Sequence, residues 1–170
     1  MARPQRIMLT VVFLGILGWI GLTVATGVGV RDALPERGYR VPEFTLVDLD
    51  GRPLTPDGLL GRPWLLHFWA TWCSSCQKEM PDLAAFAREH PEVTVLSVSV
   101  GEKEQTVVDY VAEHPVASPV ALDPNQDLYG RFAARGLPTT LWIDSRGVIR
   151  QVVTGPMTRS QMDALLATVR

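Results

Sequence analysis

Residues 64–76 read WLLHFWATWCSSC, and this stretch indicates the fold class more clearly than any other. Its first six residues form an almost wholly apolar run with the length of a buried strand. A helix-like pattern follows over residues 74–90, and a second strand-like run over residues 93–100. The order strand, helix, strand predicts a parallel βαβ unit, with Cys73 and Cys76 where the first strand passes into the helix.

The flanking sequence extends this unit into a sheet of mixed direction that is covered by helices on both faces. Turn residues such as Asp50-Gly51 and Arg146-Gly147 favour antiparallel hairpins on each side of the unit, and Thr158 with Gln161 has the pattern of a capping box. The further predicted elements are hairpins over 44–54 and 139–153, helices over 104–114, 125–134 and 158–169, and a strand over 119–122.

The N-terminal segment, residues 7–30, contains no charged residue. A helix of that length reaches about 36 Å and can cross a hydrocarbon core of about 30 Å. A cleaved signal peptide is the alternative, because Arg3 and Arg6 form a basic start and Ala25-Thr26-Gly27 offers small residues for cleavage. The predicted organisation is a cytoplasmic tail (1–6), a transmembrane signal anchor (7–30), a linker (31–40) and one domain (41–170). A short tail before a first span usually stays inside, so we expect a single-pass protein of the cell membrane with its domain on the extracytoplasmic side.

The composition excludes two classes of protein. Hydrophobic residues make up 46% of the chain, which is not a disordered composition. The 16 Lys and Arg residues against 18 Asp and Glu residues give a net charge of −2, which disfavours a protein that tracks nucleic-acid phosphates. The only 2 cysteines are too few for a disulfide-stapled fold, so redox chemistry or a metal site is expected.

Cys73 is predicted at the start of a helix, where unpaired N–H groups and the helix dipole favour a thiolate. Three other readings of the pair remain. A structural disulfide gains little from closing so short a loop, and a zinc site would need ligands from among His67, His90 and His114. The third reading is that the two cysteines are free and incidental. A reactive dithiol is favoured over all three readings, and no metal is expected.

These residues also carry a family resemblance. Residues 69–76, WATWCSSC, together with Pro81 and residues 136–139, GLPT, resemble the thioredoxin superfamily, and more narrowly the membrane-anchored thiol-disulfide oxidoreductases of the TlpA/ResA/CcmG (DsbE) type. The match runs from Pro42 to the C-terminus and includes an extra strand and helix after Val100. It implies a thioredoxin-like α/β fold with a central mixed sheet, preceded here by one transmembrane helix.

The resemblance also implies roles at the site. Cys73 is the exposed attacking cysteine, Cys76 is the buried resolving one, and Pro138 is a cis-proline facing them. A cis bond at Pro138 would present the backbone of Leu137 to an extended substrate chain, whereas an ordinary trans bond is the alternative. The residues expected to bind substrate are Trp72, Leu137, Pro138 and Thr139, and an apolar collar around Cys73 is expected from Trp69, Trp72 and Leu137.

Two ionisable residues are candidates for moving protons. On a helical wheel Glu79 is the one charged residue on the apolar face that contains Cys76, so it is predicted to be desolvated, to have a raised pKa and to exchange a proton with Cys76. A solvent-edge position is the alternative. His67 stands where thioredoxin has a buried aspartate; we expect a hydrogen-bonded strand histidine, with proton handling as the alternative.

The function expected is reduction of protein disulfides by the Cys73–Cys76 dithiol, without metal or organic cofactor. The resemblance suggests a membrane thiol transporter of the CcdA/DsbD type as reductant and an apocytochrome c as a client in cytochrome c maturation. The alternatives are a disulfide oxidase, a non-catalytic binding module and a peroxiredoxin-like thiol peroxidase. The peroxidase pattern Pro-x-x-x-Thr-x-x-Cys fails at both cysteines, because Ala70 and Cys73 occupy its threonine position.

Overall fold

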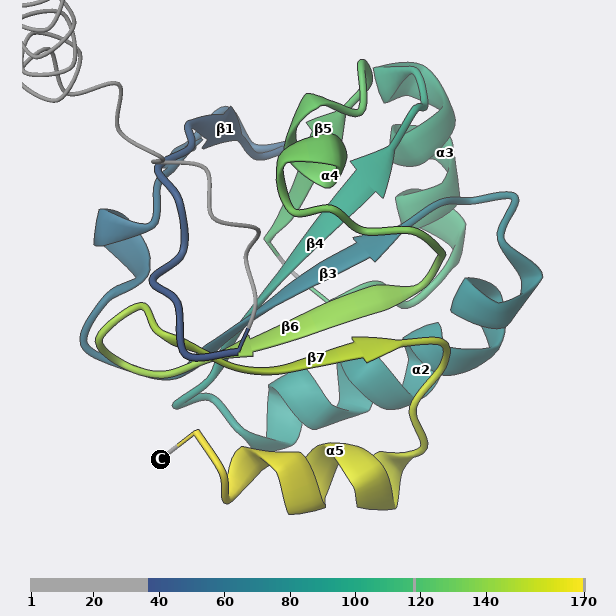
Figure 1. The fold of residues 1–170 in the computed structure, drawn as a ribbon. Coiled ribbons are helices and arrows are strands. Elements are labelled where there is room, and N and C mark those ends of the chain that lie inside the picture. The colour runs from purple at the N-terminus through teal and green to yellow at the C-terminus, as the bar shows by residue number, and fades with distance from the viewer. Residues whose placement is uncertain (1–36, 118, 170) are drawn as a thin grey trace, which may run out of the picture. The chain divides into compact units, whose positions relative to one another are not determined.

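A computed structural model of the chain describes residues 37–117 and 119–169, which contain a five-stranded sheet between two covering layers (Figure 1). The strand order is β5-β4-β3-β6-β7; β3, β4 and β5 are parallel, and β6 runs antiparallel to both β3 and β7. The strands are β1 Leu46–Val47, β2 Pro53–Leu54, β3 Trp64–Trp69, β4 Thr94–Val100, β5 Val120–Asp123, β6 Thr139–Ile143 and β7 Ile149–Thr154. The helices are α2 Ser74–Glu89, α3 Glu104–Glu113, α4 Asp127–Arg131 and α5 Arg159–Leu166, with a short 3-10 turn at Asp57–Leu59. The predicted βαβ unit and mixed sheet are confirmed.

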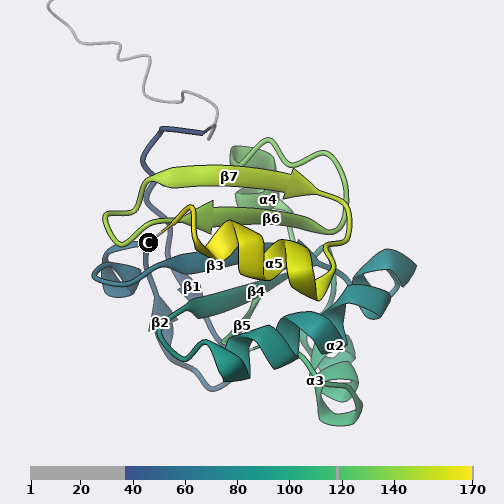
Figure 2. The same ribbon diagram turned by 90° about the horizontal axis from the view of Figure 1, so that it is seen from below.

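Side chains of β3 alternate between two hydrophobic cores. Leu65 and Trp69 pack with side chains of α2, α3 and α5 on one face, whereas Leu66 and Phe68 pack with α4 and with Val41 and Phe44 on the other. Figure 2 shows α2 and α5 side by side over one face of the sheet, with α4 on the other side. Because both faces are covered, every residue of β3 is buried, and the end of this strand is a rigid base for the cysteines.

Several elements are shorter than predicted. α4 ends at Arg131, and Ala133 takes a left-handed φ of 48°, which stops the helix before the predicted end at 134. The N-terminal hairpin keeps only two residues in each strand, because the carboxylate of Asp48 accepts the N–H groups of Asp50 and Arg52 and forms the turn. The capping box of Thr158 and Gln161 is confirmed at the start of α5.

The beginning of the described chain is paired with the sheet. Gly38 N donates to Ile149 O at 2.7 Å and Ile149 N donates to Tyr39 O at 2.9 Å, so the last residues of the predicted linker lie against the start of β7. The predicted transmembrane segment, residues 7–30, lies outside the described residues. None of the helices within residues 37–117 and 119–169 combines the length and apolar character needed to cross a bilayer.

Candidate active site

Cys73 and Cys76 lie where β3 passes into α2, as predicted. Cys73 is the N-cap of α2, its Sγ accepts the backbone N–H of Cys76 at 3.2 Å, and a disulfide joins the two residues. When the bond is reduced, the same N–H and the positive end of the helix are placed to stabilise a thiolate at Cys73. The fold therefore prepares one sulfur of the pair as a nucleophile.

The two sulfurs differ in access. Cys73 is 6% exposed and lines a cavity of about 420 Å³, whereas Cys76 has no exposed surface. Trp72, which is 70% exposed, and Leu137 line the same cavity. An incoming molecule can therefore reach Cys73 but not Cys76. The resemblance implied an exposed Cys73, whereas the residue is buried apart from the surface that it offers to this cavity.

The loop before β6 faces the cysteines and contains the cis bond that was predicted between Leu137 and Pro138. Two hydroxyls hold this loop: Thr139 Oγ1 donates to Gly136 O at 2.7 Å, and Ser75 Oγ donates to Leu137 O at 3.3 Å. Thr139 was expected to bind substrate, but it is 2% exposed and does not line the cavity, so its side chain supports the loop instead. The half-buried Leu137 reaches the cavity.

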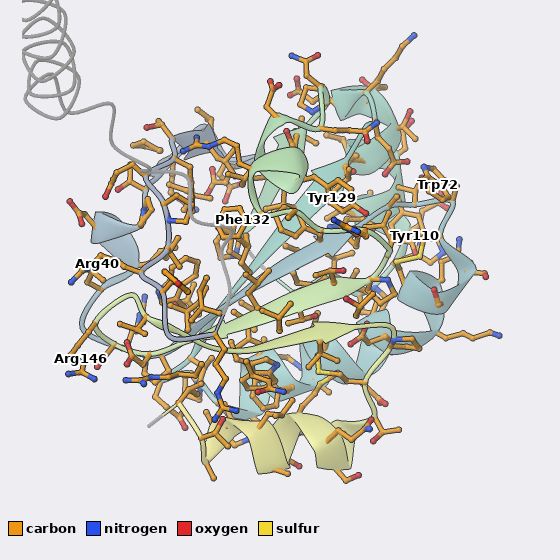
Figure 3. The ribbon with its side chains drawn as sticks, viewed as in Figure 1. Arg40, Trp72, Tyr110, Tyr129, Phe132 and Arg146 are labelled. Atoms are coloured by element: carbon orange, nitrogen blue, oxygen red, sulfur yellow. A yellow bond between two sulfur atoms is a disulfide. The ribbon has the colours of Figure 1, made fainter. Side chains whose placement is uncertain are left out.

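The apolar collar predicted around Cys73 is formed only in part. Trp69 is 1% exposed and belongs to the core, where its ring lies 5.5 Å from that of Tyr110 on α3. Figure 3 shows Trp72 and Tyr110 at one end of the molecule and Arg40 and Arg146 at the opposite end. Trp72 is thus the exposed aromatic side chain at the site, and the half-buried Tyr129 lines the same cavity.

Glu79 is buried one helical turn after Cys76, which confirms the position expected from the helical period. Its side chain is 2% exposed; Oε1 accepts the N–H of Met157 at 3.1 Å, and Oε2 has no hydrogen-bond partner within the described part of the chain. Burial raises the pKa of Glu79, the Met157 N–H lowers it and the charge of Asp82 raises it, with a result of about 7. Such a carboxyl group is able to accept or give a proton near neutral pH.

His67 is fully buried on β3, with Nδ1 at 2.9 Å from Thr140 Oγ1 and Nε2 without a partner among the described residues. Burial lowers its pKa to about 3, so the ring is neutral at physiological pH. The expectation of a hydrogen-bonded strand histidine is therefore met by one of the two ring nitrogens, Nδ1. A neutral ring does not supply the charge of the aspartate that thioredoxin has here.

Glu102 is a further residue of the site, and it was not predicted from the sequence. It follows β4, is 8% exposed, and accepts the backbone N–H of Thr71 at 2.8 Å and the hydroxyl of Ser99 at 2.7 Å. The Thr71 hydroxyl also donates to this carboxylate. Glu102 therefore fixes the turn between β3 and Cys73. An acidic residue two positions after a buried parallel strand was the available signal, because the carboxyl ends of neighbouring parallel strands meet at one edge.

The fold and this site define a class of protein: a thioredoxin-like domain that carries a disulfide at a helix N-terminus opposite a cis-proline is a thiol-disulfide oxidoreductase. A family model described as the AhpC/TSA family matches residues 38–152. The chain belongs to this family, and within it to the TlpA/ResA/CcmG type of thiol-disulfide oxidoreductase.

Individual relatives agree with this assignment. The thiol-disulfide oxidoreductase ResA of Geobacillus kaustophilus is 30% identical over 173 residues, which cover 100% of this chain and 99% of the relative. Among solved structures, StoA from Bacillus subtilis is 29% identical with a TM-score of 0.64, covering 74% of this chain and 98% of that one. A thiol:disulfide interchange protein of the thioredoxin family from Chlorobium tepidum is 26% identical with a TM-score of 0.71, covering 79% and 97%.

Proposed function

We propose that this protein reduces disulfide bonds of client proteins outside the cytoplasm, using Cys73 and Cys76 as a reversible dithiol. The observation that carries the proposal is the unequal access of the two sulfurs: Cys73 opens to the cavity beside Leu137, and Cys76 is closed off behind it. An attacking sulfur must meet a protein disulfide, and a resolving sulfur must be kept from competing clients.

The reaction is a two-step exchange. The Cys73 thiolate attacks one sulfur of the client disulfide, forming a mixed disulfide and releasing the other client sulfur as a thiolate. Cys76 then loses its proton to Glu79 and attacks Cys73, which releases the second client thiolate and leaves the Cys73–Cys76 disulfide. Two electrons pass to the client, and the released thiolates take up protons from Glu79 and water. A pKa of about 7 suits Glu79 to this proton transfer. The dithiol itself carries the electrons, and no metal or organic cofactor takes part.

The cellular setting follows from the resemblance and from the uncharged segment over residues 7–30. The domain is anchored to the extracytoplasmic face of the cell membrane. A membrane thiol transporter of the CcdA/DsbD type returns the Cys73–Cys76 disulfide to the dithiol. The cysteine pair of an apocytochrome c, before haem attachment, is the client class that the family suggests.

Reduction of insulin disulfides by the full-length chain, with a dithiol as electron source, tests the activity. We expect the wild type to turn over insulin and the Cys73→Ser variant to lose this activity. Turnover only with peroxide would replace the proposal with a thiol peroxidase, and no turnover with either substrate would leave a binding module.

The direction of electron flow is tested by equilibration with glutathione buffers. A reductase keeps its disulfide only in strongly oxidising mixtures, whereas a disulfide oxidase is already reduced by mild ones. Clients are identified with Cys76→Ala expressed in the host, because the mixed disulfide at Cys73 cannot then be resolved. Recovery of protein adducts supports the proposal, and recovery of glutathione adducts alone contradicts a dedicated protein client.

A further inference from the structure

Ser75, the second residue between the cysteines, contacts two functional atoms at once. Its Oγ lies 3.3 Å from Cys73 Sγ and 3.3 Å from the carbonyl oxygen of Leu137. A disulfide sulfur carries no hydrogen, so in this oxidised state the hydroxyl is the donor toward both atoms. A serine hydroxyl has a single hydrogen. The sulfur and the carbonyl therefore compete for one proton.

The Leu137 carbonyl is at the point where a client would bind. Leu137 precedes the cis bond to Pro138 and lines the same cavity as Cys73 and Ser75. An extended client segment seated beside Cys73 would use its backbone N–H to pair with a free carbonyl at this edge. In the oxidised protein that carbonyl already receives the Ser75 hydroxyl, so a client N–H has to share this oxygen with a first donor.

We propose that Ser75 is a positioning residue that makes the Leu137 carbonyl a stronger acceptor for the client when Cys73 is reduced than when Cys73 is in the disulfide. This inference rests on the proposed function, because it assumes that Cys73 attacks a bound protein disulfide. Ser75 acts through the two groups that it contacts and takes no part in the exchange of sulfur bonds.

The physical basis is the change of charge at Cys73. A donor dithiol that reduces the disulfide transfers two electrons and breaks the S–S bond; of its two protons one remains on Cys76 and the other goes to water, which leaves Cys73 as a thiolate. Hydrogen bonds to charged acceptors are roughly twice as strong as neutral ones, so the Ser75 hydroxyl turns to the thiolate. The Leu137 carbonyl then has both of its lone pairs available. When the disulfide forms again, the hydroxyl returns to Leu137 and competes with the N–H of the reduced client for this oxygen, which favours release of the client.

The first test measures binding by the full-length chain of an extended peptide whose cysteines are replaced by serine, so that no exchange occurs. A net hydrogen bond corresponds to roughly a two- to tenfold change in affinity. We expect the reduced wild-type protein to bind the peptide more tightly than the oxidised protein, by up to this factor. Ser75→Ala should bring the ratio to about one by strengthening binding to the oxidised form.

Two variants serve as controls. Ser75→Thr keeps a hydroxyl at the same position and should retain the wild-type ratio. Ser74→Ala removes the neighbouring hydroxyl, which is exposed and forms no side-chain hydrogen bond to the described residues, and should also leave the ratio unchanged. Equal affinities of the two wild-type redox forms, or a Ser75→Ala ratio like that of the wild type, would overturn the proposal.

A second measurement follows the ultraviolet absorbance of the thiolate in the reduced protein. Loss of one hydrogen bond to a charged sulfur should move the titration of Cys73 in Ser75→Ala toward higher pH by about one unit, with Ser75→Thr restoring it. An unmoved titration overturns the proposal. Insulin reduction by the wild type separates the role of Ser75 from the proposed reductase activity. Normal turnover by the wild type, together with an affinity ratio and a titration that do not change in Ser75→Ala, would reject the role of Ser75 but not the reductase activity.

Discussion

Replacing Glu79 with glutamine should remove a pH dependence of stability that its burial creates. The pKa of Glu79 is raised from its usual 4.5 to about 7 in the folded protein. A raised pKa means that the folded state favours the protonated carboxyl, so this stabilisation is present below pH 4.5 and is lost as the pH rises through about 7. At about 1.4 kcal/mol per unit of pKa difference, the ionised carboxylate costs the folded state about 3 kcal/mol.

Urea unfolding of the oxidised domain between about pH 4 and pH 8 measures this cost, because the disulfide-bonded cysteines do not titrate. A fragment starting at Leu34 contains the compact unit and both cores. Over this range the unfolding free energy of the wild type should fall by about 3 kcal/mol more than that of Glu79→Gln. The difference in slope is the readout, since a buried glutamine also changes the absolute stability.

Glu113→Gln is the matched control, because Glu113 is exposed on α3 and the substitution is the same. Its unfolding free energy should follow the wild type within about 0.5 kcal/mol at each pH. Parallel curves for the wild type and Glu79→Gln would refute the reasoning, since they would mean that Glu79 titrates like an exposed carboxylate.

Three further substitutions test the supports of the site and the domain. Glu102→Gln removes one acceptor of the Thr71 turn. It should lower the unfolding free energy, measured in urea, by about 1–3 kcal/mol and slow insulin reduction. Unchanged values in both assays would show that the turn keeps its conformation without Glu102. Trp72→Ala should leave stability within about 0.5 kcal/mol, because the side chain is exposed, but raise KM for a protein disulfide, and an unchanged KM would remove Trp72 from the binding surface. Burial raises the pKa of Asp144, but the Val148 N–H and the Arg150 guanidinium lower it more, so its stabilisation is present above the usual pKa of 3.8 and lost as pH falls through the lowered value. Asp144→Asn should therefore destabilise the domain by about 2 kcal/mol at neutral pH and by progressively less in acid, and a constant loss at every pH would contradict this.

Local patterns in the sequence predicted the parts of the site that lie on one element. The apolar run of β3 and the helical period of α2 placed Cys73 and Cys76 at the junction and Glu79 on the buried face. These predictions succeed because side-chain periodicity and helix-terminus chemistry are properties of neighbouring residues.

Contacts between distant segments were not predictable in the same way. Glu102 binds Thr71 across 31 positions and Ser75 binds Leu137 across 62, and both contacts depend on the order of strands in the sheet. The end of α4 was also missed, because Ala133 adopts a left-handed φ that usually signals glycine. Tertiary packing, not local preference, decides these features.

The rate of alkylation of Cys73 in the reduced protein, measured against pH and located by peptide mapping, tests whether the start of α2 stabilises a Cys73 thiolate. The N–H of Cys76 and the N-terminus of α2 predict a Cys73 that reacts faster than free cysteine at neutral pH and keeps its reactivity into mild acid. A Cys73 that reacts no faster than free cysteine, with the same dependence on pH, would contradict the account.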